Sequence, residues 1–252
     1  MTQVFQNLTP THGRTCGAIS SSMTDDRVFQ LFADDNYRFA SCSVRVYDRN
    51  RGPDDLLVQL YRASKPRLSS TFCNMRDLSP AAVTAYLSTR NPLLLMCVDN
   101  PDIDSGSEII GYAFLTTIAG PAKGTVNPDP GRTAFLGYTM FRPWWGRPEI
   151  TVCMMLCGIY FFHEFNLLTL QGESVPGNEL TRRFLRQFGT KTTGIIPKFL
   201  LHGGVMVDCH ISCLYRADLE SYCRKVLSDC TSQYDSDPDP VSPLCHVNDD
   251  NT

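Results

Sequence analysis

The sequence lacks the features that mark several large classes of protein. Its first residues, MTQVFQNLTPTHG, contain neither a basic start nor an apolar run, so we expect no secretory signal. The unbroken apolar run from Val152 to Phe162 is too short to span a bilayer. A formal net charge of −3 gives no general attraction to nucleic acid or to anionic membranes, and no internal repeat is visible. We therefore expect a cytoplasmic protein with no nucleic-acid partner and no membrane partner.

Eleven cysteines are many for a chain of 252 residues, yet their number is odd and no Cys-x-x-Cys spacing occurs. Cys153 with Cys157, and Cys209 with Cys213, are four residues apart in apolar surroundings, and only His210 lies nearby as a further metal ligand. Reduced thiols that pack as small hydrophobic groups are favoured over a metal site. A nucleophilic cysteine is disfavoured too, because no cysteine precedes a signature turn.

With 42% hydrophobic and 19% charged residues, the chain can bury one good core. We predict an N-terminal arm and helix at residues 1–40, one α/β domain at 41–227, and a disordered acidic tail rich in Pro and Ser at 228–252. The sequence leaves the oligomeric state open, and a homodimer or an assembly partner is compatible with it.

The stretch from Thr133 to Glu173 organises the rest of the chain. It predicts a strand from Thr133 to Phe141, a short turn, a helix, and a second strand that contains LLTL after Asn166. Pro148 suits the first position of the helix, where its missing N–H costs little and the next carboxylate meets the positive end of the dipole. The helix is apolar almost all round, which is typical of a buried helix. Such a strand-helix-strand unit predicts parallel or splayed strands with a ligand-sized gap at their C-terminal ends.

The remaining periodicity predicts a mixed α/β fold with one central sheet. Further expected helices are DDRVFQLFADD after a cap at Thr24, one opened by Pro53, one opened by Ser79 and Pro80, one from Asn178 to Gly189, and a short one from Asp218. Further expected strands are SCSVRVYD, a hairpin of LLLMCVD with EIIGYAFLTTI, and two closing strands joined at His202-Gly203-Gly204.

Three stretches carry a resemblance to a known family. FRPWWGR, at 141–147, is similar to a strand end followed by Trp-Gly-Arg. PGNELTRRFLRQFG is similar to a Pro-x-Asn-x-x-Ser helix that ends in Leu-Gly, and FLLHGGVMVDCHISCLYRADLE is similar to a closing hairpin. On these stretches residues 41–220 resemble the GNAT superfamily, the acyl-CoA N-acyltransferase fold, and most closely its branch that acetylates the N-termini of ribosomal proteins.

The resemblance implies a sheet splayed between its fourth and fifth strands, with acetyl-CoA as cosubstrate. It also implies transfer of an acetyl group to a primary amine, either a peptide or protein N-terminus or a small molecule. In such a site a strand N–H stabilises the oxyanion, the pyrophosphate lies on the N–H groups that open the long helix, and a carboxylate or a bound water takes the proton of the amine.

The resemblance also implies the site residues. Glu173 is the expected general base, although a surface carboxylate is an equally good interpretation. The tyrosine acid of the family falls on Leu185, so Tyr138 is the candidate for that role. Asn178 is expected either to reach the pantetheine arm or only to cap its helix. The predicted residues for binding acetyl-CoA are Met140, Phe141, Arg142, Trp145, Gly146, Arg147, Asn178 and Thr181, and no metal ligand is predicted.

One stretch departs from the family pattern. The phosphate turn, Gln/Arg-x-x-Gly-x-Gly/Ala, falls on Trp145, Pro148 and Ile150. Pro148 supplies no N–H, and we expect the branched side chain of Ile150 to obstruct the phosphate. The leading interpretation is an N-acetyltransferase. The alternative is a non-catalytic GNAT-like structural or interaction protein, for example a virion-associated or accessory protein, with a degraded pyrophosphate turn.

Overall fold

A computed structural model describes residues 25–48, 79–90, 92–117, 133–202 and 205–234 of the chain. The expected helix at Pro53, the loop at 119–132, the N-terminal arm and most of the acidic tail lie outside these residues. The elements in chain order are α1 (Asp25–Asp34), β1 (Arg38–Phe39), β2 (Cys42–Val46), α3 (Pro80–Ser88), β3 (Leu93–Asp99), β4 (Ser107–Thr117), β5 (Thr133–Met140), the 3₁₀ turn η3 (Arg142–Trp144), α4 (Pro148–Glu164), β6 (Thr169–Ser174), α5 (Glu179–Arg186), β7 (Lys191–His202), β8 (Val205–Tyr215) and α6 (Arg216–Tyr234).

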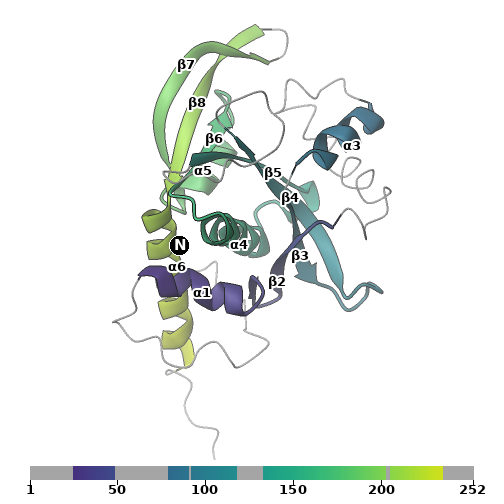
Figure 1. The fold of residues 1–252 in the computed structure, drawn as a ribbon, viewed down its shortest axis with the longest axis vertical. Coiled ribbons are helices and arrows are strands. Elements are labelled where there is room, and N and C mark those ends of the chain that lie inside the picture. The colour runs from purple at the N-terminus through teal and green to yellow at the C-terminus, as the bar shows by residue number, and fades with distance from the viewer. Residues whose placement is uncertain (1–24, 49–78, 91, 118–132, 203–204, 235–252) are drawn as a thin grey trace, which may run out of the picture.

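The described strands form one mixed eight-stranded sheet in the order β1-β2-β3-β4-β5-β6-β8-β7 (Figure 1). All neighbours in it are antiparallel except β5 and β6, which run parallel. The parallel pair is the one joined by α4, because a crossover helix is what such a connection needs. The expected α/β class and the strand-helix-strand unit are therefore confirmed, with the second strand beginning at Thr169.

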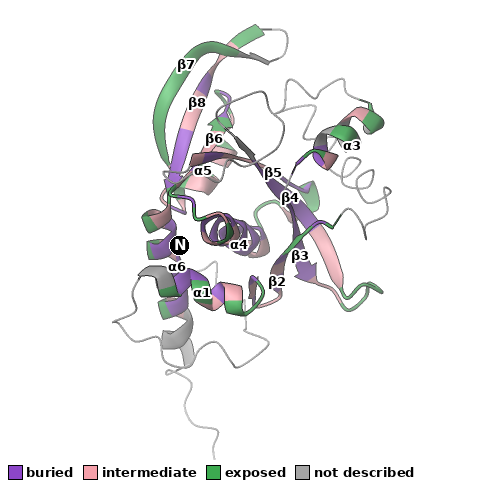
Figure 2. Cartoon of the chain, in the orientation of Figure 1, coloured by how far each residue is buried: buried purple, intermediate pink, exposed green. Residues whose placement is uncertain are grey.

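Helix α4 is the centre of the core. It begins at Pro148 as expected, and every residue from Ile150 to Ile159 is buried (Figure 2). Helices α1 and α6 contact α4, and α4 in turn contacts β2 and β3. The helix needs no polar face because protein surrounds it on all sides. No helix in the described part of the chain is both long enough and apolar enough to cross a membrane.

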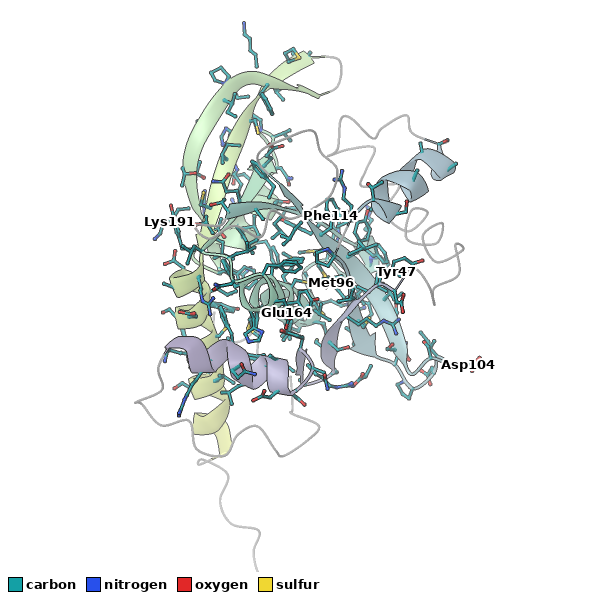
Figure 3. All side chains as sticks on the ribbon, viewed as in Figure 1. Tyr47, Met96, Asp104, Phe114, Glu164 and Lys191 are labelled. Atoms are coloured by element: carbon teal, nitrogen blue, oxygen red, sulfur yellow. The ribbon has the colours of Figure 1, made fainter. Side chains whose placement is uncertain are left out.

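At β3 the sheet is buried on both faces, which explains the unbroken apolar run of this strand. Leu94, Met96 and Val98 join the cluster around α4, whereas Leu93 and Leu95 join a second cluster with Leu87 of α3. Figure 3 labels Met96 from the first cluster, beside α4, and Phe114 and Tyr47 from the second. One face of the sheet is thus turned toward α4 and the other toward α3.

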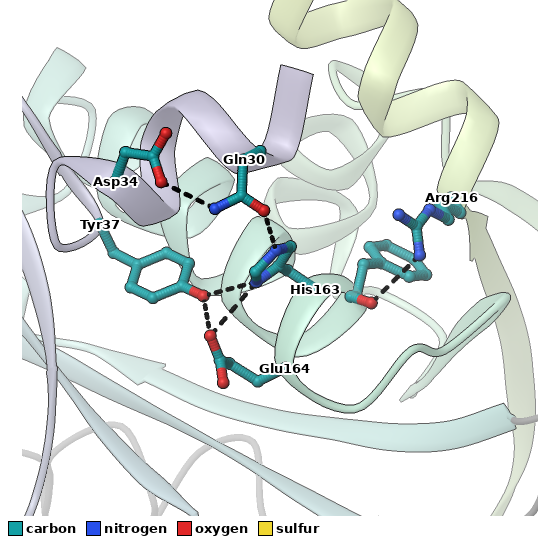
Figure 4. A network of polar contacts seen from close by, with 7 residues as sticks. Gln30, Asp34, Tyr37, His163, Glu164 and Arg216 are labelled. Carbon is teal, nitrogen blue, oxygen red and sulfur yellow. Dashed lines mark hydrogen bonds and ion pairs between the residues drawn. The ribbon is translucent and has the colours of Figure 1, made fainter. Parts of the chain in front are cut away.

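A polar network links the end of α1 to the end of α4 (Figure 4). The hydroxyl of Tyr37 donates to Glu164 Oε1 and lies 3.0 Å from His163 Nδ1. His163 Nε2 is 3.2 Å from Gln30 Oε1, and the Gln30 amide donates to Asp34 at 2.7 Å. Burial and the neighbouring Glu164 carboxylate raise the pKa of Tyr37, so its hydroxyl remains a donor at neutral pH.

The C-terminal third departs from expectation in one respect. β7 and β8 form the expected antiparallel hairpin, and most of β7 is exposed at the edge of the sheet (Figure 2). However, α6 begins at Arg216 and continues for 19 residues to Tyr234. The prediction of a short helix that starts at Asp218, followed by a tail from 228, was therefore wrong in its bounds. Leu219, Cys223 and Val226 are buried against the core, which holds the longer helix in place.

Candidate active site

The candidate site lies where β5 and β6 stop pairing. Their ladder consists of Thr133 with Thr169, Ala134 with Leu170, and Phe135 with Gln171. Both strands continue beyond it: β5 runs on to Met140 beside β4, and β6 runs on to Ser174 beside β8. The C-terminal halves of these two parallel strands are therefore paired on their outer sides only.

Strand geometry places the two predicted catalytic residues on opposite faces of the sheet. Ala134 and Leu170 are opposite each other and both face α4, as does Tyr138, which packs against the same cluster. Because side chains alternate along a strand, Glu173 faces the other way from Leu170. The structure therefore does not bring Tyr138 and Glu173 together on one face.

Glu173 is exposed to solvent, yet the surrounding protein removes enough water from its carboxyl group to raise its pKa. Cys209 of β8 shares this face and is buried. Burial, together with the negative charge of Glu173, raises the pKa of the Cys209 thiol to about 11. Cys209 is therefore an uncharged thiol at neutral pH, which makes Cys209 itself a poor nucleophile. The following cysteines are free and buried, as predicted for packing thiols: Cys42, Cys97, Cys153, Cys157, Cys209, Cys213 and Cys223.

The chain that follows β5 turns back toward the side of β5 that faces β6. The N–H of Phe141 donates to Ile110 of β4 at 2.9 Å, so the carbonyl of Met140, in the same peptide unit, points away from β4 toward β6. The indole N–H of Trp145 donates to this carbonyl at 2.9 Å. Met140 and Phe141 themselves are buried in the two clusters. Trp145, which is 41% exposed, thus covers the last residue of β5, Met140, at the end of the edge where the pairing with β6 is missing.

The turn between β5 and α4 carries two exposed cations. The guanidinium of Arg147 lies 4.7 Å from the ring centroid of Trp144, whose indole N–H donates to Glu108 at 3.1 Å. Arg142 is also exposed. Gly146 has φ of +78°, and no atom lies within 4 Å of the place that a Cβ would take. The turn therefore offers open space beside two positive charges.

The start of α4 differs from the expectation at one residue. Pro148 is the first helical residue and supplies no N–H, as predicted. Ile150 is 3% exposed and belongs to the core cluster, so its side chain points inward. The prediction that Ile150 obstructs a phosphate was therefore wrong. Instead, Glu149 places a carboxylate in the first turn, and its Oε2 is buried without a hydrogen-bond partner among the described residues.

Helix α5 and its N-cap supply the last predicted residues, and α5 supplies one further residue, Arg182, that the sequence did not indicate. Asn178 stands at the N-cap position, but its side chain makes no capping hydrogen bond, so the predicted capping role was wrong. Thr181 is half-buried on the first turn. In the next residue, Arg182, Nη1 lies 2.9 Å from His210 Nδ1 of β8. In the described ranges, no three His, Cys, Asp or Glu residues are placed to hold a metal ion.

Comparison with known proteins identifies the fold. No protein-family model and no curated protein matches the sequence. Among solved structures, RimJ of Mycobacterium smegmatis, in complex with CoA-disulfide, has 15% identity and a TM-score of 0.57 over 74% of this chain and 88% of its own. The ribosomal-protein-S5-alanine acetyltransferase of Vibrio fischeri has 15% identity and a TM-score of 0.55 over 72% of this chain and 97% of its own.

The chain has the GNAT acetyltransferase fold. RimL, a ribosomal L7/L12 alpha-N-protein acetyltransferase in complex with coenzyme A, is a further neighbour with 12% identity and a TM-score of 0.55, covering 69% of this chain and 94% of its own. The structural neighbours of this GNAT fold thus include enzymes that bind CoA. The recognition made from FRPWWGR and the two later stretches is confirmed at the level of the fold.

Proposed function

We propose that this GNAT-fold chain transfers an acetyl group from acetyl-CoA to a primary amine, on a peptide or protein N-terminus or on a small molecule. The observation that carries the proposal is the end of the β5–β6 ladder at Phe135 and Gln171, while both strands continue. We place the thioester in a slot between the two backbone edges that no longer pair. Backbone N–H groups on the free edge of β5 would then face the acetyl carbonyl.

Glu173 is the proposed general base. It lies two residues beyond the last pair between β5 and β6, on the face away from α4. An amine attacks only after it loses a proton, and a base is most effective when its pKa lies near the working pH. Desolvation moves the pKa of Glu173 upward from the usual range of a carboxyl, which is the direction that this role requires.

At the phosphate end of the site, CoA would be bound mainly by side chains and less by backbone N–H groups. Arg142 and Arg147 offer charge, and the open space at Gly146 admits a phosphate. Pro148 withholds one donor, and the Glu149 carboxylate opposes an anion. One charged hydrogen bond is worth about 1.5–3 kcal/mol, so the missing donor alone should weaken binding roughly tenfold to a hundredfold.

The proposal is tested by titrating acetyl-CoA into the protein in a calorimeter and by following release of free thiol with a panel of peptides and small amines. We expect binding, and thiol release that depends on the amine. Glu173→Gln should retain acetyl-CoA binding and lose most of the thiol release. Asp104→Asn, on the exposed turn between β3 and β4 (Figure 3), is the matched control and should change neither.

A second candidate rests on the start of α4. Pro148 and Glu149 together favour a GNAT-like scaffold that has given up the cosubstrate and serves as a structural or interaction protein. In that case acetyl-CoA produces no heat at millimolar concentration, and no amine causes thiol release. Binding without release for any amine tested would instead leave a CoA-binding module.

A further inference from the structure

A polar cluster, in which Ser174 is buried and Arg182 and His210 are half-buried, joins α5 to the ends of β6 and β8. Ser174, the last residue of β6, lies directly opposite His210 in the antiparallel ladder, so both side chains point to the same face. His210 Nδ1 is 2.9 Å from Arg182 Nη1, and Arg182 Nη2 donates to Glu179 at 2.9 Å. The guanidinium of Arg182 is thus held from two sides.

The direction of the hydrogen bond between Arg182 and His210 follows from the chemistry of the two groups. An arginine has no acceptor, so the N–H of Arg182 donates and His210 Nδ1 accepts. In this hydrogen bond the Nδ1 lone pair of His210 points at the guanidinium of Arg182. Glu173 and Cys209 lie on the other face of these strands, so Arg182 is the charge that His210 contacts. His210 acts here as a positioning residue that fixes the guanidinium.

Two polar atoms of the cluster have no hydrogen-bond partner among the described residues. Ser174 is 7% exposed, and its Oγ has no hydrogen-bond partner in the described ranges of the chain. The Nε of Arg182 is buried and equally without a partner there. Burying polar groups without partners costs free energy, and native proteins keep few of them. The Nε–H of Arg182 is a donor on a cation, so a ligand that completes it accepts a hydrogen bond, and the Ser174 hydroxyl can donate to the same ligand. A ligand with negative charge gains most from the guanidinium.

The cluster stands at one side of the proposed slot. Ser174 follows Glu173 but faces α4, because alternate residues of β6 point to opposite faces. The amine and its base would thus be on one face and the cluster on the other. Resting on the proposed acetyl transfer, we propose that the Ser174 hydroxyl and the Arg182 guanidinium receive the sulfur of CoA as it leaves, in the form of a thiolate.

The bonds and charges of this step balance. The amine nitrogen forms a bond to the acetyl carbon, and the bond between that carbon and sulfur breaks. The electron pair of the broken bond stays on sulfur, where Ser174 and Arg182 bind it. The proton released by the nitrogen goes to the Glu173 carboxylate. No oxidant, reductant or metal is needed.

The test measures the ionisation of the CoA thiol when CoA is bound to the intact protein. The ultraviolet absorbance of the thiolate is followed against pH for free CoA, for CoA with the wild type, and for CoA with variants. The wild type should lower the thiol pKa relative to free CoA. Removing one donor with Ser174→Ala should reduce the thiolate-to-thiol ratio roughly tenfold to a hundredfold. Arg182→Gln should have a similar effect.

The controls separate this role from a structural one. Arg183→Gln, at an exposed neighbour on α5, should leave the thiol pKa as in the wild type. Ser174→Ala removes a buried group without a partner, so the protein without CoA should be at least as stable as the wild type, and loss of folding cannot explain the result. A thiol pKa equal to that of free CoA, or unchanged in Ser174→Ala, overturns the inference while acetyl transfer stands. Absence of CoA binding overturns the inference and the proposed function together.

Discussion

Replacing Tyr37 with phenylalanine should weaken the attachment of α1 to α4 without disturbing the aromatic packing between them. The substitution removes the hydroxyl that donates to Glu164 and contacts His163. The ring keeps its edge-on contact with Tyr160, whose centroid is 4.8 Å away. Any loss of stability therefore reports the hydroxyl alone.

The size of the effect follows from the charge and exposure of the acceptor. A hydrogen bond to a charged group contributes about 1.5–3 kcal/mol to stability. The side chain of Glu164 is 43% exposed, so water replaces part of the lost bond and the lower end of that range applies. We expect a loss of about 1.5 kcal/mol. For a chain of this size that corresponds to a fall in Tm of roughly 3–6 °C.

The measurement is urea unfolding followed by circular dichroism, with a thermal melt beside it. Tyr160→Phe is the matched control, because the described part of the chain shows no hydrogen bond to the Tyr160 hydroxyl, and it should cost less than about 0.5 kcal/mol. The raised pKa of Tyr37 adds a test based on pH. The Tyr37 hydroxyl should stabilise the folded protein fully below the unfolded tyrosine pKa of about 10, and this stabilisation should be lost progressively as the pH rises above that value. Equal losses in the two variants would refute the reasoning.

Three further predictions concern the candidate site. Ile150→Ala, at a residue 3% exposed, should cost about 2–5 kcal/mol in denaturant unfolding and leave CoA affinity unchanged; tighter binding would mean that the side chain faces phosphate after all. Pro148→Ala adds an N–H and should tighten CoA about tenfold, but not pantetheine, whereas Pro80→Ala at the start of α3 should change neither. Glu173→Gln should raise Tm at neutral pH, because the raised pKa makes the ionised carboxylate unfavourable in the folded state; this advantage should shrink as the pH falls through the raised pKa toward about 4.3, and an advantage that does not depend on pH would contradict it.

The fold was readable from the sequence wherever local signals agree with the tertiary structure. Pro148 with Glu149 marked the start of α4, and Ser79 marked the start of α3, where its Oγ accepts the N–H of Ala82 at 3.2 Å. Proline and capping residues act through their own backbone, so their effect does not depend on distant packing. The hairpin of β7 and β8 was predictable because its signal, two apolar strands joined at His202-Gly203-Gly204, is also local in the sequence.

Features that depend on distant contacts were not readable. β1 has only two residues and exists because β2 pairs with it, at a turn where Asn36, Tyr37 and Ala40 adopt positive φ. The inward direction of Ile150 was hidden because α4 is apolar on all sides, and such a helix carries no sequence signal for its rotation. The contact between Arg182 and His210 joins residues 28 positions apart through the packing of α5 on β8, and neither residue stands in a motif that predicts it.

The alternation of β6 has a chemical consequence for the proposed reaction. β6 pairs with β8 without a bulge from Thr169 to Ser174, so Glu173 and Ser174 are fixed on opposite faces of the sheet. A proton taken up by Glu173 is then separated from the sulfur by the strand itself. Protonated Glu173 therefore cannot pass its proton directly to the sulfur, so in the proposed step the thiolate leaves unprotonated and is held by the Arg182 guanidinium. Under this reasoning, an inserted residue before Glu173 would exchange the two faces. Acetyl transfer should be lost in such a variant even if its far-ultraviolet circular dichroism matches that of the wild type.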